Sequence, residues 1–244
     1  MKIINKPTVT YKQCENWIKS KRTANKLALE NLPIMWNAAI ENNIDPAVLI
    51  AQSMLETGWY NFGGVVPASY CNPCGLKITK GGGCQDVGAH MRFFSWEDGI
   101  MAQSDHLALY AGGPTVPKYS PECASHQNSD KKANGTTKDP RHFTYLYGKC
   151  PTVESLSGNW AMSKTYGADL IKMINEIKSM PGAEPIVQEP VPKPDTTKIE
   201  ETIKQLESNM KDPIKSTVNE NINVLKKQAK SILEQARKYM FKKR

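Results

Sequence analysis

The stretch DPAVLIAQSMLETGW, residues 45–59, encodes a helix with a clear signal at each end. Asp45 is a favourable N-cap, and Pro46 suits the first helical position, where its missing N–H costs no hydrogen bond. Gly58 is a common helix stop and follows the last apolar turn closely. The helix is therefore expected to run from Pro46 to about Glu56, which places the Glu56 carboxyl at the negative end of the helix dipole.

Helical patterns also lie on both sides of this segment. Residues 10–13, TYKQ, fit a capping box that starts a first helix. A second helical stretch reaches about Asn43, with Pro33 either opening or kinking it. Apolar residues return at helical spacing in residues 96–110 and again in residues 166–180.

The segments between these helices have the composition of loops. Gly, Pro and Asn punctuate residues 59–94, which predicts loops with a short hairpin. Residues 112–140 are polar and predict a long surface loop. The fold class expected for residues 1–180 is therefore α+β and mainly helical.

Composition favours one packed domain followed by an appendage. The 39% of apolar residues, with five Trp and nine Tyr, suffice for a core. Five prolines between Pro181 and Pro194 predict a stiff, extended linker over residues 181–195. Beyond it, apolar residues recur every three or four positions, so residues 196–244 are expected to form a long amphipathic helix, or two helices broken near Pro213.

Positive charge is concentrated in this tail. The chain has a net charge of +8, and residues 196–244 hold twelve Lys or Arg against six Asp or Glu. A basic segment attracts anionic polymers, acidic lipid and nucleic acid alike, so the charge indicates no specific nucleic acid partner. We expect the tail to mediate self-association or docking to a larger assembly, with binding to a membrane surface or an anionic polymer as the alternative.

The sequence contains no evident targeting signal. The opening residues, MKIINKP, lack the apolar run of a secretory signal. No run approaches the roughly 18 apolar residues of a membrane span. The chain is therefore expected to be made in the cytoplasm, without a signal peptide or a transmembrane segment.

Three cysteines and a histidine are closely spaced. Cys71, Cys74, Cys84 and His90 read C-x2-C-x9-C-x5-H. They would suit a tetrahedral zinc site if a loop gathered them, although the spacing is not a standard one. Separate free thiols, which commonly behave as small apolar residues, or a disulfide are the alternatives. None of the four histidines is paired in sequence with a nucleophile, and we interpret them as structural.

Glu56 has the most suggestive chemical setting. Apolar Leu55, Trp59 and Phe62 flank it, and an apolar surround keeps a carboxyl protonated to higher pH by disfavouring the anion. An acid in that state can donate its proton to a leaving group. A Glu at a helix end is nevertheless most often a solvated surface charge, so this position alone assigns no function.

Three motifs in a fixed order narrow the choice of protein family. They are IAQSMLETGW at residues 50–59, NPCGLK at residues 72–77 and FSWEDGI at residues 94–100. Together they resemble glycoside hydrolase family 73, the endo-β-N-acetylglucosaminidases found in bacterial autolysins, flagellar muramidase-like proteins and phage lysins. The likeness covers about residues 10–180, and the ordered trio is more specific than any one motif.

The resemblance implies a lysozyme-like, two-lobed catalytic domain in residues 1–180, with Glu56 as general acid. It implies hydrolysis of the β-1,4 bond after N-acetylglucosamine in bacterial peptidoglycan, with no cofactor and no metal. It further implies action at the cell wall, after holin-dependent release, as part of a phage virion, or as an exported autolysin. A muramidase or lytic transglycosylase is the alternative within the class. A non-catalytic wall-binding or phage tail structural module is the alternative from another class.

A second carboxylate is expected in the loop after the NPCGLK motif. Asp86 is the only acid between Lys77 and Trp96, so the resemblance assigns it the second catalytic role. The distance between the two carboxyls would indicate the mechanism, since retaining glycosidases hold them about 5 Å apart and inverting ones about 6.5 to 9.5 Å. The alternative is that Asp86 is a solvated loop residue and that the 2-acetamido group of the substrate assists.

Four residues are expected to contact the substrate. Trp59 and Tyr70 offer ring faces for stacking on sugars, although an aromatic residue is more often part of a core. Asn72 is expected to tie down its loop and to touch the glycan. The family's late motif has two tyrosines before the last helix. Tyr166 matches the second and is expected to line the groove, whereas Trp160 stands in place of the first.

Overall fold

The computed structural model describes residues 1–114, 131–132 and 135–182, which are mainly helical with little strand. Four short 3-10 turns lie in the loops between the helices, and one pair of two-residue strands forms a small hairpin. The elements are α1 (Tyr11–Ser20), α2 (Lys26–Glu30), α3 (Leu32–Glu41), α4 (Pro46–Glu56), η1 (Ala68–Tyr70), η2 (Val87–Ala89), α5 (Trp96–Ala111), β1 (Lys131–Lys132), β2 (Gly135–Thr136), η3 (Thr144–Leu146), η4 (Glu154–Leu156) and α7 (Tyr166–Lys178).

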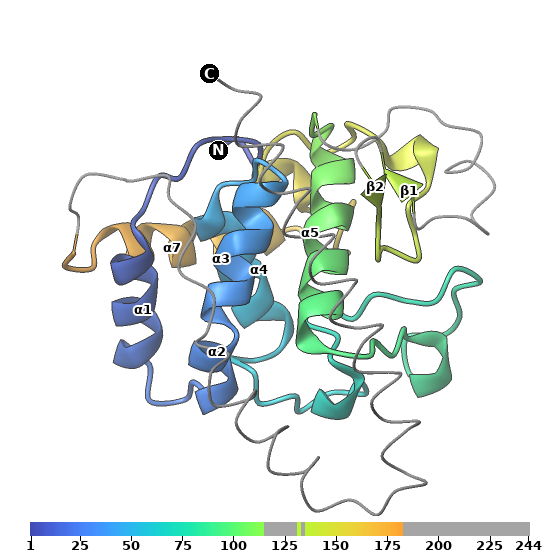
Figure 1. Ribbon diagram of the computed structural model, residues 1–244, viewed down its shortest axis with the longest axis horizontal. Helices are drawn as coiled ribbons and strands as arrows, with labels where there is room; N and C mark the ends of the chain where they lie inside the picture. Colours follow the sequence, from blue (N-terminus) through green and yellow to red (C-terminus); the bar gives the residue numbers. More distant parts are fainter. Residues whose placement is uncertain (115–130, 133–134, 183–244) are drawn as a thin grey trace, which may run out of the picture. The chain divides into compact units, whose positions relative to one another are not determined.

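Helix α4 lies at the centre of the core. Its residues from Pro46 to Met54 are all buried, as expected for a helix that is apolar around its whole circumference. Helices α3 and α7 pack against it, and α5 packs against α3. Figure 1 shows α3, α4 and α5 in the middle of the described region, with α1 at one side and the β1–β2 hairpin at the other. The end of α4 is therefore held by neighbours on several sides.

The predicted helix ends are confirmed. Thr10 caps α1 in a capping box with Gln13, each side chain bonding the backbone N–H of the other. Asp45 caps α4 by accepting from the N–H of Ala47 at 3.1 Å. Pro33 lies in the first turn of α3, so it opens a helix and does not kink one.

A second, smaller apolar cluster anchors the loops between α4 and α5. Cys74, Leu76, Phe93 and Ala102 form it, and Trp160 packs against its edge. An antiparallel bridge between Lys77 and His90 closes the base of the loop between them. This region has loops and isolated bridges, as its Gly and Pro content predicts.

The prediction of a long surface loop over residues 112–140 is wrong for the end of that stretch. Strands β1 and β2 pair antiparallel there, with Lys131 opposite Thr136. Thr137 and Asp139 are almost fully buried. The polar composition misled the prediction because these polar side chains are buried with partners: Thr137 donates a short hydrogen bond to Asp105, a residue of α5.

Several predictions fall outside the described residues. The linker from residue 183 onward, the tail helix and its proposed contacts lie there, as do residues 115–130. In the described part of the chain, no helix is long and apolar enough to cross a membrane.

Candidate active site at the end of helix α4

A hollow of about 430 Å³ opens where α4 ends. Glu56 and residues 62–66 form one part of its wall, and Asn72, Cys84 and His90 contribute from the loop side. Among the described residues that line this hollow, Glu56 is the only one with a carboxylate. Any proton donation by a carboxylic acid to a molecule in the hollow therefore falls to Glu56.

Two side chains bind the same oxygen of Glu56. The Tyr166 hydroxyl donates to Oε1 at 2.5 Å, and the Trp160 indole N–H donates to Oε1 at 3.1 Å. Within the described part of the chain, no group donates a hydrogen bond to Oε2. A neutral carboxyl accepts on its carbonyl oxygen and carries its proton on the other oxygen. The two donors therefore place the proton of neutral Glu56 on Oε2.

The surroundings favour the protonated form of this carboxyl. Burial raises the pKa of Glu56, and this effect outweighs the lowering by the hydrogen bonds from Tyr166 and Trp160. The residue still exposes surface where it borders the hollow, so a bound molecule can reach it. Burial, together with the adjacent Glu56, raises the pKa of the Tyr166 hydroxyl, which therefore stays neutral and keeps its proton for donation.

Trp160 is supported from α5 by a buried contact between a histidine and an aspartate. The His106 ring meets the Trp160 ring edge-on, with their centroids 5.1 Å apart, and His106 Nδ1 lies 2.8 Å from Asp139 Oδ2. Burial alone would raise the pKa of Asp139, but His106 and His142 outweigh it and lower that pKa to about 2. Asp139 is thus ionised at any ordinary pH and holds His106 against Trp160.

The turn after α4 has an uncommon backbone. Trp59, Tyr60 and Phe62 have positive φ values of 62°, 62° and 53°, which cost a bulky residue about 1 kcal/mol or more each. Thr57 offsets this strain, because its carbonyl accepts from the Phe62 N–H at 3.0 Å and its hydroxyl from the Tyr60 N–H at 2.9 Å. The rings of Tyr60 and Phe62 also pack against Trp96. This wall of the hollow is therefore fixed in shape.

Asn72 fixes the facing loop, as expected from the sequence. Its Nδ2 donates to the carbonyls of Leu76 and Met91 at 2.8 and 2.9 Å, and its Oδ1 accepts from the Leu76 N–H at 2.9 Å. The side chain is almost completely buried although it borders the hollow. These bonds occupy both polar ends of the amide.

Trp59 lies next to the hollow and does not line it. Its ring packs on Trp17, with centroids 4.7 Å apart, and Lys21 Nζ lies 5.6 Å from its centroid. Trp59 lines a neighbouring hollow of about 400 Å³. Gly58 borders both hollows, so they meet at the turn that follows Glu56.

Tyr70 and Asp86 line neither of these hollows. The guanidinium of Arg92 lies 5.9 Å from the Tyr70 ring centroid. Asp86 is exposed, and its Oδ1 accepts from the Gly88 N–H at 2.9 Å, which caps the turn η2. The structure therefore brings together Glu56 and Asn72 around one hollow, and it leaves Tyr70 and Asp86 outside it.

The described cysteines are separate free thiols. Cys74 is buried in the small apolar cluster, whereas Cys84 is exposed with its Sγ 3.4 Å from Lys77 Nζ. Across the described ranges, no group of His, Cys, Asp and Glu is arranged to hold a metal ion. The zinc and disulfide alternatives for Cys71, Cys74, Cys84 and His90 find no support in this geometry.

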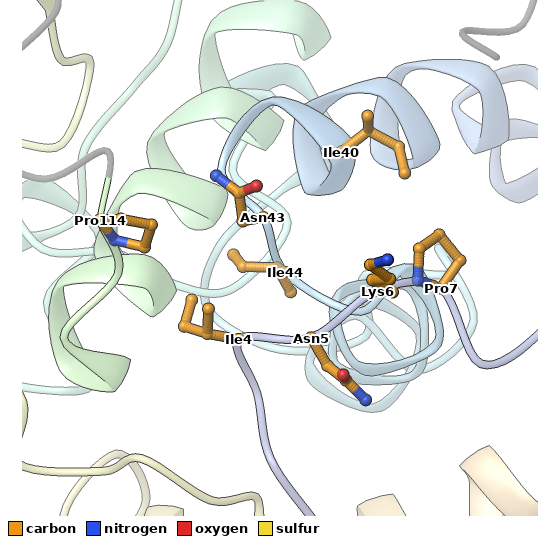
Figure 2. A pocket seen from close by; sticks show the side chains of 8 residues that line it. All are labelled: Ile4, Asn5, Lys6, Pro7, Ile40, Asn43, Ile44 and Pro114. Atoms are coloured by element: carbon orange, nitrogen blue, oxygen red, sulfur yellow. The ribbon is translucent and has the colours of Figure 1, made fainter. Parts of the chain in front are cut away.

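A further hollow, of about 360 Å³, lies between the N-terminal segment and the end of α3. Figure 2 shows Ile4 and Pro7 of that segment facing Ile40 and Ile44. Its lining is largely apolar and contains no carboxylate, so it offers no acid for catalysis. The hollow that Trp59 lines does contain two acids, Asp169 and Glu176, but hydrogen bonds from Lys21 and Trp17 lower the pKa of Glu176, which favours its ionised form. The hollow beside Glu56, where burial raises the pKa of the carboxyl, is therefore the candidate active site.

Sequence reasoning missed part of the support around Glu56. Tyr166 was expected to line the groove, but it is almost completely buried and donates to Glu56. The role of Trp160 had one signal, since it stands where the family has a tyrosine. Gln52, whose Nε2 donates to the Tyr166 hydroxyl at 3.2 Å, had another signal, because a residue four positions before Glu56 lies on the same face of the helix.

Comparison with known proteins agrees with this architecture. A family model named Glucosaminidase, described as mannosyl-glycoprotein endo-β-N-acetylglucosaminidase, matches residues 32–179. An uncharacterized protein of Borreliella burgdorferi is 27% identical over 134 residues, which are 53% of each chain, so the present chain spans about half the length of that curated relative. No solved structure matches significantly. The mainly helical unit is consistent with a lysozyme-like glucosaminidase domain. The family match spans more than half of the chain, which therefore belongs to the glucosaminidase family, glycoside hydrolase family 73.

Proposed function

We propose that this protein is a peptidoglycan hydrolase that cleaves the β-1,4 bond after N-acetylglucosamine, with Glu56 as general acid. The observation that carries the proposal is the setting of Glu56. It is the one carboxylate among the described residues of the hollow, its pKa is raised by burial, and its two donors leave Oε2 to carry the proton. Membership of the glucosaminidase family supports the substrate class.

The catalytic step follows from that arrangement. Glu56 Oε2 donates its proton to the glycosidic oxygen as the bond between that oxygen and the anomeric carbon breaks. A water oxygen then bonds the anomeric carbon, directly or after attack by the second catalytic group, and the proton that this water loses returns the acid to its starting form. The carboxylate that forms is stabilised by the bonds from Tyr166 and Trp160 to Oε1, because hydrogen bonds to an anion are stronger than those to a neutral acceptor. Tyr166 and Trp160 therefore stabilise Glu56 most strongly after its proton has left.

The second catalytic group is proposed on the loop side of the hollow. Asp86 is proposed for this role, and it lies on the exposed loop that also brings Cys84 and His90 to the hollow. Its carboxylate would have to turn from its cap on Gly88 to reach the substrate. Assistance by the 2-acetamido group of the substrate is the alternative, and it needs no second carboxylate.

Substrate contacts are proposed on both sides of Gly58. Asn72 borders the hollow beside Glu56, and Trp59 borders the neighbouring one, so a glycan longer than two sugars would extend from one to the other. Tyr70 is proposed as an outer contact on the loop side. The role of Tyr166 is proposed to be the hydrogen bond to Glu56 in place of a direct contact with sugar.

Digestion of purified peptidoglycan, followed by mass spectrometry of the new glycan ends, tests the proposal. Reducing N-acetylglucosamine ends are expected. Reducing muramic acid ends would indicate a muramidase, anhydromuramic ends a lytic transglycosylase, and the absence of cleavage a structural module. Any of these three results contradicts the proposed bond specificity.

The change Glu56→Gln tests the assigned acid in the same assay. It keeps the shape of the side chain but removes the proton, so activity should fall by about 100-fold or more. Glu97→Gln is the matched control, because Glu97 is an exposed residue in the first turn of α5. A Glu56→Gln protein that keeps more than about a tenth of wild-type activity would remove Glu56 from the mechanism.

The tail and the place of action are further parts of the proposal. We propose that residues 196–244 mediate self-association or docking to a larger assembly, and that the protein acts at the cell wall as a phage lysin, a virion-associated lysin or an autolysin. Analytical sedimentation of the full chain beside a chain ending at Met180 tests self-association through the tail. A full chain that sediments as a monomer at physiological salt would contradict self-association.

A further inference from the structure

A buried polar chain runs through the centre of the fold to Glu56. Gln52 and Ser53 lie in α4, and Gln103 lies in α5. All three side chains are fully buried, and Tyr166 is nearly so. Polar groups in an apolar core are costly unless each is hydrogen-bonded, so four of them in contact call for a structural or functional reason.

The hydrogen bonds of this chain run in one direction. Ser53 Oγ donates to Gln103 Oε1 at 2.6 Å, and Gln103 Nε2 donates to Gln52 Oε1 at 3.0 Å. Gln52 Nε2 then donates to the Tyr166 hydroxyl at 3.2 Å. The hydroxyl, with one of its lone pairs used as an acceptor, donates its own hydrogen to Glu56 Oε1 at 2.5 Å.

The direction of the two amides has a chemical consequence. If both amides were turned over, Gln52 would present its oxygen to Tyr166, and the hydroxyl would donate to Gln52 in place of Glu56. In the structure Ser53 completes the observed order, because its hydroxyl donates to Gln103 Oε1 at 2.6 Å. The order of donors and acceptors in the core thus decides whether Tyr166 donates to Glu56 beside Trp160.

We propose that Gln52 and Gln103 are positioning residues, whose aligned amides keep the Tyr166 hydroxyl donating to Glu56 Oε1, so that Tyr166 and Trp160 together keep the acid proton on Oε2. The inference rests on the proposed role of Glu56 as general acid. It goes beyond that role by assigning a function to two buried residues that do not border the hollow. Neither amide touches the substrate, so their effect on catalysis passes through Tyr166.

Other titratable groups around Glu56 are few in the described part of the chain. Tyr166 comes from α7, and Cys74, Cys84 and His90 come from the loop side. The pKa of Cys74 is raised by burial and by the nearby Glu56, so this thiol is neutral. From α5, His106 reaches Glu56 only through Trp160.

The test reverses the amide chain and follows the acid directly. Gln52→Glu places an acceptor where Gln52 Nε2 donates, so Tyr166 should turn its hydrogen toward residue 52. The kcat for glycan should then fall by about tenfold, the order expected for one hydrogen bond to a charged group, with KM little changed. Loss of that bond and the added negative charge both raise the pKa of Glu56, so the fall of activity at high pH should move to higher pH, and the uncharged variant Gln52→Met separates the two causes.

Three further variants isolate the effect of direction. Gln52→Met removes the amide without adding charge. It should move the decline of activity to higher pH as well, by less than Gln52→Glu does. Gln103→Glu acts one step earlier, because its carboxylate attracts the Nε2 group of Gln52 and turns the Gln52 oxygen toward Tyr166. It should give the same shift of the pH–activity profile, and it serves as the test if the Gln52→Glu protein folds poorly. Gln13→Glu is the control, because it makes the same change at a buried glutamine whose hydrogen bonds do not lead to Glu56. Gln13 lies in α1 and donates to the carbonyls of Lys178 and Met180 at 2.9 and 3.1 Å.

A second readout separates this inference from the proposed function. The pKa of the Glu56 carboxyl, followed by carbon-13 NMR in the full chain, should rise in Gln52→Glu and Gln103→Glu and stay unchanged in Gln13→Glu. Folded variants whose Glu56 pKa and pH profile match those of the wild type would overturn the inference, whatever the wild type cleaves. Loss of the proposed function would instead appear as a wild-type protein that leaves peptidoglycan intact.

Discussion

The two sides of the hollow beside Glu56 differ in burial. On the helical side, Gln52 of α4, Gln103 of α5 and Tyr166 of α7 are buried and hydrogen-bonded to one another. On the loop side, residues 82–88 are exposed. Tyr166 of α7 donates to one oxygen of Glu56 from the helical side, and Trp160 donates to the same oxygen from the turn before α7. The loop side contributes Cys84 and His90 to the hollow but no carboxylate. The contrast indicates that the proposed acid is held against the helical core by buried partners, whereas the proposed second group would come from an exposed loop or from the substrate.

The largest effect on the helical side is expected from Tyr166→Phe. The change removes the hydroxyl donor from Glu56 but keeps the ring in the core, so kcat should fall by about 10- to 100-fold. Because that bond lowers the pKa of Glu56, its loss raises this pKa, and the decline of activity at high pH should move upward. A pH–rate profile measures both effects.

A matched control for this prediction is Tyr147→Phe. The Tyr147 hydroxyl donates to the carbonyl of Gly112 at 3.2 Å and has no bond to Glu56. An equal loss of activity in the two variants would mean that Tyr166 acts only through packing.

A smaller effect is expected from Trp160→Phe, because the longer of the two hydrogen bonds to Glu56 is lost. Turnover should fall by about tenfold, and the pH profile should shift upward as for Tyr166→Phe. Trp160→Tyr restores a donor of the type that the family has at this position and should recover part of the activity. Steady-state kinetics of the two variants show whether a donor at position 160 supports turnover. If Trp160→Tyr is no more active than Trp160→Phe, donation by residue 160 is unimportant.

Asp139→Asn should change stability more than turnover. The side chain is fully buried and contacts His106 and His142, and removing the charged partner from such a buried contact costs about 3 kcal/mol. The pKa of Asp139 is lowered to about 2, so its stabilising contribution is present above the ordinary pKa of about 4 and is lost as the pH falls toward 2. Denaturant unfolding should therefore show a deficit at pH 7 that narrows below pH 4. A deficit that is independent of pH would contradict the ionised state of Asp139.

The smallest effect is expected on the loop side, from Asp86→Asn. Asn keeps the cap on Gly88, so the melting temperature should hardly change. Turnover should fall if Asp86 provides the second catalytic group, by less than the loss in Glu56→Gln. Unchanged turnover would assign the second role to the substrate's acetamido group or to positioned water.

The same contrast explains how much could be predicted from the sequence. Local signals placed α1, α4 and the ends of their neighbours, because caps, Pro at the first turn and apolar spacing act within a few residues. The position of Glu56 at the end of α4 followed from Gly58 and the motif around it. These features depend on contacts that are close in sequence.

The support around Glu56 could not be predicted in the same way. Tyr166 is 110 residues from Glu56 and Trp160 is 104 residues away, so no local pattern links them. Gln103 meets Gln52 from a different helix, 51 residues along the chain. Polar residues within apolar helices indicate that partners exist, but only the packing of α4, α5 and α7 identifies them.

The most direct test of the central claim is to compare two titrations of the wild-type protein. One follows the carbon-13 shift of the Glu56 carboxyl, and the other follows kcat/KM for glycan as the pH rises. The account predicts that Glu56 titrates above the ordinary range of a glutamate and that activity declines with the same midpoint, because only the protonated acid can donate. A Glu56 that ionises at its ordinary pKa while activity persists at much higher pH would contradict the claim that it is the general acid.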